Sequence, residues 1–244
     1  VISDLHTIDT QLWKINNDLT LIVGDLTNGG LTEEYITIFQ SFKTKCIFPV
    51  VGNHDTYFGS FMKDMLNQTN YVHCVNDTCF IQLDVVTYSL NDIKQFLIQK
   101  LTENKAASHI FISQHYESYS TGEFRTDENF AKMYEQIIDS GEYPNIRAIF
   151  TGHDHVFAAF KYQNVFTFVV GAISKLDTPY TDSWWGSREL HGDVSQFLYG
   201  GQHHLDSFMR LGQLRVQINT NTIVYSFCIL EGTNRQVLVE YTQV

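Results

Sequence analysis

The chain has few basic residues and no long apolar run. Its 244 residues include 16 Lys and Arg against 27 Asp and Glu, which gives a formal net charge of -11. This shortage of cations argues against a nucleic-acid-binding surface, because Lys and Arg supply most of the affinity for phosphate backbones. No stretch is long and apolar enough to be predicted as a membrane span. We attribute most of the acidity to a solubilising surface, with part of it offset by bound divalent cations.

The sequence also lacks features that would divide it into separate units. It has three prolines, and no Pro/Ser-rich linker, internal repeat or low-complexity tract interrupts it. Hydrophobic residues make up 43% of the chain, which is enough for one substantial core. We therefore expect a single domain over 1–244, with a motif core over 1–175, a long loop over 176–210 and closing β-strands over 211–244.

Cysteine is scarce, with four residues in the chain. Cys46 and Cys228 each lie in an apolar, strand-like run and are predicted to be buried thiols. Cys74 and Cys79 flank a turn-like segment and could close a small disulfide loop in an oxidising compartment, but the sequence leaves this pairing open. The first strand is reduced to its last residues, so we expect the chain to begin inside a longer gene product. The compartment stays open between extracytoplasmic and cytoplasmic.

Short apolar runs alternate with helical patterns along the first 175 residues. Such runs are typical of strands buried on both faces; they cover Leu19–Val23, Cys46–Val51, Phe80–Thr87, His109–Ser113, Ile146–Phe150 and Val165–Val170. Helical periodicity separates them over Thr32–Phe42, Asp92–Leu101 and Asp127–Asp139. The alternation predicts an α/β layered fold, and the segment from Leu211 to Tyr241 reads as antiparallel strands that close one sheet.

Five short motifs supply side chains that can bind metal ions. They are D-L-H at 4–6, G-D at 24–25, G-N-H-D at 52–55, S-Q-H at 113–115 and G-H-D-H at 152–155. Four of them follow a predicted strand, and strand ends are where α/β proteins place ligands. The candidate metal ligands are Asp4, His6, Asp25, Asn53, His115, His153 and His155. This mixture of oxygen and imidazole donors suits two divalent ions, whether Mn, Zn, Fe, Co or Ni.

The motifs differ in specificity. Gly-His-x-His at 152–155 is the sharpest, because it is rare by chance and its two imidazoles can each reach a different metal. The carboxylate of Asp25 stands at the tip of a glycine turn, where it can bridge two cations. His54 cannot easily share the ligand direction of its neighbour Asn53, so it is predicted to act as an acid or a transition-state donor.

Two aspartates within the motifs are not predicted to be ligands. Asp55 is expected to support the site from behind or to be structural. Asp154 is expected to face solvent or to orient a neighbouring side chain.

In their order the motifs resemble the calcineurin-like metallophosphoesterase superfamily, whose pattern is D-x-H, G-D, G-N-H-[DE], H and G-H-x-H. The resemblance spans residues 4–155 and implies a four-layer α/β/β/α sandwich of two mixed sheets with a dinuclear metal centre. It implies one metal held by Asp4, His6, Asp25 and His155, and a second held by Asp25, Asn53, His115 and His153. It further implies hydrolysis of phosphate monoesters or diesters by a metal-bridging hydroxide, with Asp25 and His54 in catalytic roles.

Departures from related patterns disfavour two branches of this superfamily, the purple acid phosphatases and the serine/threonine protein phosphatases. Purple acid phosphatases have a glycine where this chain has His6 and a tyrosine where it has Asn28. Serine/threonine protein phosphatases read G-D-x-x-D-R-G and G-N-H-E, whereas residues 24–30 read G-D-L-T-N-G-G and the later motif ends in aspartate. The sequence around 24–30 is closer to the cyclic-nucleotide and general phosphodiesterase branch.

The segment 176–210 carries no motif, yet it is long and contains unusual residues. We hypothesise that Trp184, Trp185 and His191 contact the substrate, with Tyr116 and Tyr119 lining the same cleft. The alternative is an ordinary packed surface loop.

Two competing functions are an interaction module that keeps the fold without activity and a nuclease of the same superfamily, the latter disfavoured by the acidic charge. The expected partner is a phosphorylated small molecule or a phosphodiester. The oligomeric state stays open.

Overall fold

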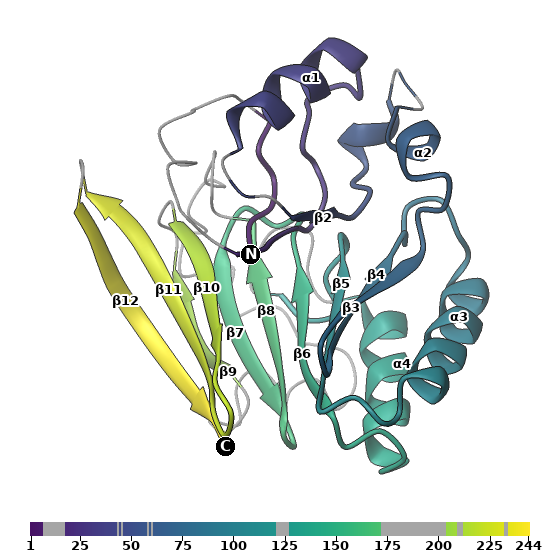
Figure 1. Ribbon diagram of the computed structural model, residues 1–244, viewed down its shortest axis with the longest axis vertical. Coiled ribbons are helices and arrows are strands. Elements are labelled where there is room, and N and C mark those ends of the chain that lie inside the picture. Colours follow the sequence, from purple (N-terminus) through teal and green to yellow (C-terminus); the bar gives the residue numbers. More distant parts are fainter. Residues whose placement is uncertain are drawn as a thin grey trace, which may run out of the picture.

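Figure 1 shows the computed structural model of the chain. The structure describes residues 1–6, 18–42, 44, 46–57, 59, 61–120, 127–171, 204–208, 212–231 and 234–244. The helical elements are α1 (Thr32–Ser41), the short 3-10 turn η1 (His54–Thr56), α2 (Phe61–Leu66), α3 (Leu90–Glu103) and α4 (Glu128–Asp139). The strands are β1 (Thr20–Ile22), β2 (Ile47–Pro49), β3 (Tyr71–Val75), β4 (Thr78–Leu83), β5 (His109–Gln114), β6 (Ile146–Thr151), β7 (Phe157–Tyr162), β8 (Val165–Val170), β9 (His204–Phe208), β10 (Gly212–Ile218), β11 (Ile223–Glu231) and β12 (Asn234–Gln243).

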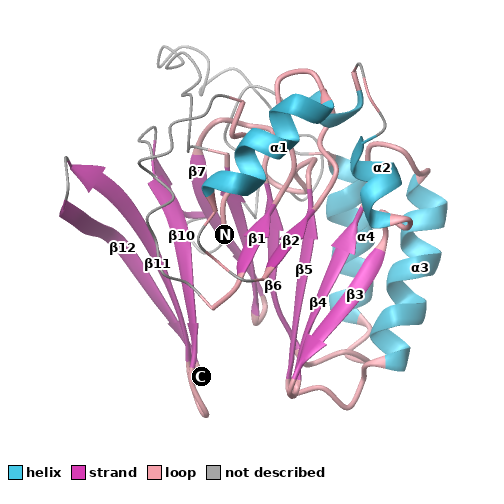
Figure 2. Ribbon diagram, turned by 45° about the horizontal axis from the view of Figure 1, so that its top comes forward, coloured by secondary structure: helices cyan, strands magenta, loops and turns pink. Residues whose placement is uncertain are grey.

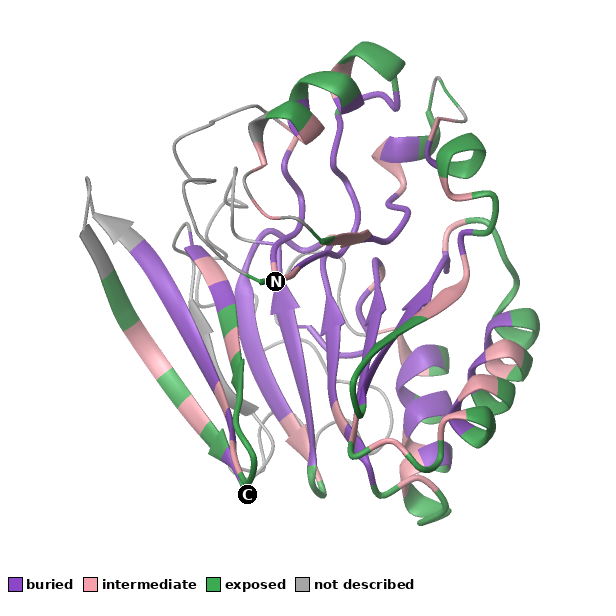
Figure 3. Cartoon of the chain, in the orientation of Figure 1, coloured by how far each residue is buried: buried purple, intermediate pink, exposed green. Residues whose placement is uncertain are grey.

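Within the part of the chain that the structure describes, the main sheet has seven strands in the order β3-β4-β5-β6-β8-β7-β9. β4, β5, β6 and β8 are parallel and therefore end at the same edge (Figure 1). Side chains alternate along each strand, so Phe111 and Phe150 lie on one face while Ile112 and Ile149 lie on the other. The isoleucine face packs against α3 and α4 (Figure 2). Figure 3 shows that these strands are buried along most of their length, as expected for a sheet covered on both faces.

Two smaller sheets lie on the phenylalanine face. One is the antiparallel sheet β10-β11-β12, and the other is the parallel pair β1-β2. The first residues connect them: Val1 N donates to Leu214 O at 2.6 Å, Leu214 N donates to Val1 O at 3.2 Å, and Ile2 N donates to Leu21 O at 3.0 Å. Residues of β1, β10 and β11 share one apolar cluster with the main sheet. A second cluster joins β1 to α1 and α2.

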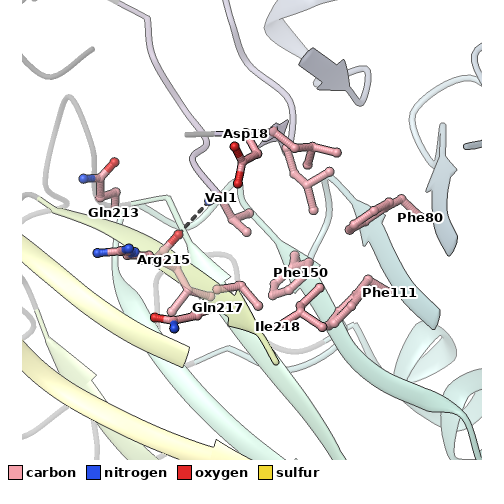
Figure 4. A pocket seen from close by; sticks show the side chains of 13 residues that line it. Val1, Asp18, Phe80, Phe111, Phe150, Gln213, Arg215, Gln217 and Ile218 are labelled. Atoms are coloured by element: carbon pink, nitrogen blue, oxygen red, sulfur yellow. Dashed lines mark hydrogen bonds between the residues drawn. The ribbon is translucent and has the colours of Figure 1, made fainter. Parts of the chain in front are cut away.

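A cavity of about 330 Å³ lies between β10 and the main sheet (Figure 4). Phe80, Phe111 and Phe150 line it from the main sheet, and Val1 and Arg215 line it from the other side. None of its lining residues is a candidate metal ligand, so the cavity is separate from the chemistry predicted above.

The predicted mixed α/β class is confirmed, and each predicted apolar run and helical pattern corresponds to an element of the structure. The four-layer sandwich stays a prediction, because the described strands outside the main sheet form two separate ladders. Among the described helices, none is long and apolar enough to cross a membrane.

Several local predictions need correction. Cys46 is exposed rather than buried, whereas Cys228 is buried as predicted. Part of the loop expected over 176–210 is strand β9, which pairs antiparallel with β7 at the edge of the main sheet. An edge strand that is held by backbone pairing requires no apolar pattern. The strand expected over Phe80–Thr87 ends at Leu83 instead, because Asp84 Oδ1 accepts from two backbone N–H groups beyond it and forms a turn.

Whether Cys74 and Cys79 form a disulfide was left open by the sequence, and the hairpin of β3 and β4 answers it. β3 and β4 pair with Cys74 opposite Cys79, and the two form a disulfide. The turn residue Asn76 has a positive φ of 54°, which asparagine tolerates better than most residues.

Candidate metal centre

Strand ends bring the candidate ligands together. Asp25 follows β1, Asn53 follows β2, His115 follows β5, and His153 and His155 follow β6. Asp4 and His6 lie beside them, held by backbone hydrogen bonds from Asp4 N to Gly24 O and from Leu5 N to Asp25 O. The structure therefore gathers all seven candidate ligands that the motifs supply.

Four of these residues adopt an unusual backbone conformation. Asp4, His6, Asp25 and His153 have φ values of 56°, 35°, 50° and 67°. Non-glycine residues in this region cost on the order of 1–3 kcal/mol each, and such strain concentrates at functional sites. The fold therefore tolerates backbone strain at four of the positions that carry candidate metal ligands.

A first group consists of one aspartate and two histidines. Nε2 of His155 lies 3.7 Å from Asp4 Oδ1 and 3.3 Å from Nε2 of His6, and His6 Nε2 lies 3.9 Å from the same aspartate oxygen. Two imidazole nitrogens and a carboxylate oxygen therefore face a common point.

A second group surrounds the fully buried His115. Its Nε2 lies 3.4 Å from Asp25 Oδ1 and 3.0 Å from Asn53 Oδ1. The ring of His153 lies 5.1 Å from the His115 ring, measured between centroids. His115 Nδ1 donates to Val23 O at 2.9 Å, because a carbonyl oxygen can only accept. Nε2 is therefore the nitrogen directed at Asp25 Oδ1 and Asn53 Oδ1.

Asp25 lies between the two groups. Its Oδ1 faces His115, and its Oδ2 lies 3.6 Å from His6 Nε2. The Asp25 side chain is 2% exposed. One side chain thus presents one oxygen to each group, which is the arrangement that a bridging ligand requires.

The donor sets fit divalent cations. Ligand bonds of about 2.0–2.2 Å place neighbouring ligand atoms roughly 3 to 3.6 Å apart around one ion, and the contacts above run from 3.0 to 3.9 Å. Ligand atoms of Asp4, His6 and His155, and likewise those of Asp25, His115 and His153, lie within 4.8 Å of one another. The nitrogen and oxygen mixture suits first-row transition ions.

Electrostatics distinguish the histidines. Burial disfavours a charge on His115, but Asp25 outweighs it and raises the pKa of His115 to about 9. Burial likewise opposes a charge on Asp25, yet His115 and the N–H of His54 lower its pKa to about 2. Burial and then His115 lower the pKa of His153 to about 4, and burial lowers that of His6. His6 and His153 are therefore neutral near pH 7, which is the form that binds metal.

Asp55 stabilises the turns that carry Asp25 and Asn53. Its carboxylate accepts hydrogen bonds from the N–H groups of Leu26, Thr27 and Gly52, and from the hydroxyls of Thr27 and Tyr35, at 3.0 to 3.4 Å. Those contacts fit the supporting role expected for Asp55.

Asp154 is fully buried, so the solvent-facing alternative was wrong. Its carboxylate accepts a hydrogen bond from Ser120 Oγ. This bond holds the loop that carries His153 and His155.

His54 stands beside the two groups in a different environment. Its N–H donates to Asp25 Oδ1 at 2.9 Å, and its Nδ1 donates to Asn28 O at 3.0 Å. Its Nε2, 4.0 Å from Asp25 Oδ2, therefore faces the centre. The side chain is 33% exposed, whereas those of Asp25 and His115 are at most 2% exposed. His54 is thus more exposed than His6, His115 and His155, whose side chains are 9%, 0% and 11% exposed, so a substrate can reach it more easily than these three.

The structure describes only some of the residues that were predicted to contact the substrate. Trp184, Trp185 and His191 lie outside the described residues. Tyr116 is half-buried beside the centre, with its ring 4.9 Å from the His153 ring. Tyr119 is 2% exposed and bonded to Glu135 of α4, so its predicted place in the cleft was wrong.

One residue at the centre was missed by the sequence analysis. Tyr57 is 53% exposed, and its ring lies 4.6 Å from that of His54. No sequence pattern identifies it, because a lone aromatic residue after the motif carries no signal by itself.

Comparison with solved structures supports the fold. The chain is similar to GAP50, described as the anchor in the inner membrane complex of Plasmodium, with a TM-score of 0.72 and 14% identity over 99% of this chain and 86% of that one. It is similar to PhoD (TM-score 0.61, 12% identity, 98% and 67% covered) and to a dimetal phosphatase from Danio rerio (TM-score 0.60, 9% identity, 99% and 96% covered). Comparison with curated proteins gave no significant match.

A family model provides the sequence-level assignment. The model described as calcineurin-like phosphoesterase matches residues 1–157, which contain all five motifs. This is well over half of the chain and coincides with the residues that form the centre. The chain therefore belongs to the calcineurin-like phosphoesterase family.

Proposed function

We propose that this protein hydrolyses phosphate monoesters or diesters at a dinuclear metal centre. The position of Asp25 is the observation that carries the proposal: one oxygen lies 3.6 Å from His6 Nε2 and the other 3.4 Å from His115 Nε2. A buried carboxylate shared between two nitrogen-rich groups suits a pair of cations, because it reduces their mutual repulsion.

One ion would be held by Asp4, His6, Asp25 and His155, and the other by Asp25, Asn53, His115 and His153. Two such cations activate water and neutralise charge that develops on phosphorus-bound oxygens. The protein supplies the fixed orientation of the ligands. Mn, Zn, Fe, Co and Ni all remain suitable for these donors.

His54 is the proposed proton donor to the leaving oxygen. Its Nδ1–H is engaged by Asn28 O, so Nε2 is the nitrogen that faces the centre. Its partial exposure leaves room for the leaving group between His54 and solvent. Tyr116, and in the segment 176–210 Trp184, Trp185 and His191, are the proposed substrate contacts.

We also propose that the chain folds in an oxidising compartment. The Cys74–Cys79 disulfide supports this, since such bonds persist chiefly outside the reducing cytosol.

The proposal is tested by removing metals with a chelator, reloading with Mn²⁺, Zn²⁺ or Mg²⁺, and measuring turnover. The substrate panel is p-nitrophenyl phosphate, bis-p-nitrophenyl phosphate, cyclic nucleotides and nucleotides. We expect turnover of at least one ester by the loaded protein. Asp25→Asn should lose both ions and activity. His54→Ala should retain both ions and lose about 10²–10⁴-fold in kcat.

The matched control is Asp139→Asn, an exposed aspartate bonded to Tyr162 and Gln163, which should leave turnover unchanged. Absence of turnover with every metal would contradict the enzyme proposal. It would favour the competing role of a non-catalytic interaction module. The similarity of fold to GAP50, a protein described as an anchor, is the reason to consider that role.

A further inference from the structure

Asn53 differs from the other candidate ligands in having only one suitable atom. A carboxylate offers two equivalent oxygens, whereas a carboxamide offers one oxygen and one NH₂ donor. A half-turn about the terminal bond of Asn53 would present the NH₂ group to a cation. Some neighbouring group must therefore hold the amide in the productive orientation.

Tyr57 and His115 together are placed to provide that control: a tyrosine hydroxyl can accept or donate, so Tyr57 fixes the rotation of the amide, while His115 Nε2 faces its oxygen. Nδ2 of Asn53 donates to the Tyr57 hydroxyl at 3.0 Å, while Oδ1 faces His115 Nε2, also at 3.0 Å. In the opposite orientation, the amide oxygen would leave the His115 side and the NH₂ group would point at the candidate ligands. Only the observed orientation gives the oxygen to the same point as Asp25 Oδ1 and His115 Nε2.

Local structure fixes Tyr57 in this place. Asn53 and Tyr57 both have right-handed helical backbone angles and flank the turn η1. The turn brings the two side chains together, as the hydrogen bond from Asn53 Nδ2 to the Tyr57 hydroxyl shows. Thr56 reinforces the turn, since its N–H and its Oγ1 both donate to Asn53 O, at 3.3 and 2.9 Å. The Tyr57 ring also lies 4.6 Å from the His54 ring, which limits its rotation.

We infer that Tyr57 is a positioning residue: its hydroxyl holds the Asn53 amide so that Oδ1 is presented to the second metal ion. The inference rests on the dinuclear centre proposed above. Tyr57 itself contacts the ligand rather than the ion. Removing such an outer partner typically weakens metal affinity about 10–100-fold.

The test compares Tyr57→Phe with the parent chain, because this change removes only the hydroxyl. Mn²⁺ alone is titrated into the metal-free protein by calorimetry, with electron paramagnetic resonance to distinguish single ions from coupled pairs. We expect the first ion to bind as in the parent and the second to bind about 10–100-fold more weakly. Coupled pairs should then appear only at higher Mn²⁺ concentration.

Two further variants separate orientation from a general effect. Asn53→Ala removes the side chain that Tyr57 holds, so adding Tyr57→Phe to that background should not change Mn²⁺ affinity further. Tyr88→Phe, at an exposed tyrosine, is the matched control and should bind both ions as the parent does. Circular dichroism verifies that each variant is folded.

The outcomes separate the two proposals. If the parent binds two ions and Tyr57→Phe binds them equally tightly, the role of Tyr57 is refuted and the dinuclear centre stands. An equal loss in the Asn53→Ala background also refutes the positioning role. A parent chain that binds fewer than two ions contradicts both proposals.

Discussion

Gly24→Ala tests how closely the fold is built around the candidate centre. Gly24 has a φ of +92° and lies directly before Asp25. A Cβ at this position would lie 2.3 Å from His115 Nδ1 and 2.9 Å from the Cα of Gly52. His115 cannot easily withdraw, because it is fully buried and Nδ1 is bonded to Val23 O at 2.9 Å.

Two separate costs add up in this variant. A positive φ costs alanine roughly 1–2 kcal/mol more than glycine. Displacing His115 is an overpacking cost of about 1–3 kcal/mol. We therefore expect the free energy of unfolding to fall by about 2–5 kcal/mol in the metal-free protein. The displaced imidazole should also lose its direction toward Asp25, so binding of the second metal should be lost.

Gly141→Ala is the matched control. Gly141 also has a positive φ, of 66°, but a Cβ there would meet nothing within 4 Å. It should lose only the backbone contribution of about 1–2 kcal/mol and bind metal normally. Urea unfolding and Mn²⁺ titration of both variants provide the measurements. Equal destabilisation with equal metal binding in the two variants would refute the close approach of Gly24 to His115.

Two other predictions follow from the charges and the disulfide. Asp25 raises the pKa of His115 to about 9, so below that pH a cation must displace a proton from His115. The affinity for the second ion should therefore rise with pH up to about 9 and then level off. An affinity that calorimetry finds constant across the neutral pH range would contradict this assignment. Replacing Cys74 and Cys79 together by serine should lower the free energy of unfolding by about 2 kcal/mol, because the closed loop is short. The control Cys46→Ser, at an exposed free thiol, should leave the free energy of unfolding unchanged. An equal effect of the two changes in urea unfolding would exclude a stabilising disulfide.

The sequence predicted the elements that have a strong apolar pattern. Runs such as His109–Ser113 and Ile146–Phe150 are strands because both of their faces are covered. β3 was missed because all of its residues are partly or fully exposed. β9 was missed because it is an edge strand, joined to β7 by backbone pairing, which leaves little trace in the sequence.

The candidate ligands were identifiable from motif order, but their geometry was not. Spacing alone could not show that the two oxygens of Asp25 face different histidines. Positive φ values at Asp4 and His153 accompany tertiary hydrogen bonds, from Asp4 N to Gly24 O and from His153 N to Asp4 Oδ2, that no local pattern records. Tyr57 was missed because a lone aromatic residue after a motif carries no signal until the turn places it against Asn53.

The bridging position of Asp25 is the central claim, and anomalous X-ray diffraction from Mn²⁺-loaded crystals tests it most directly. The account predicts two anomalous peaks about 3.5–4 Å apart, each beside a different oxygen of Asp25. One peak should be surrounded by Asp4, His6 and His155, and the other by Asn53, His115 and His153. A single peak, or two peaks without Asp25 between them, would contradict the account.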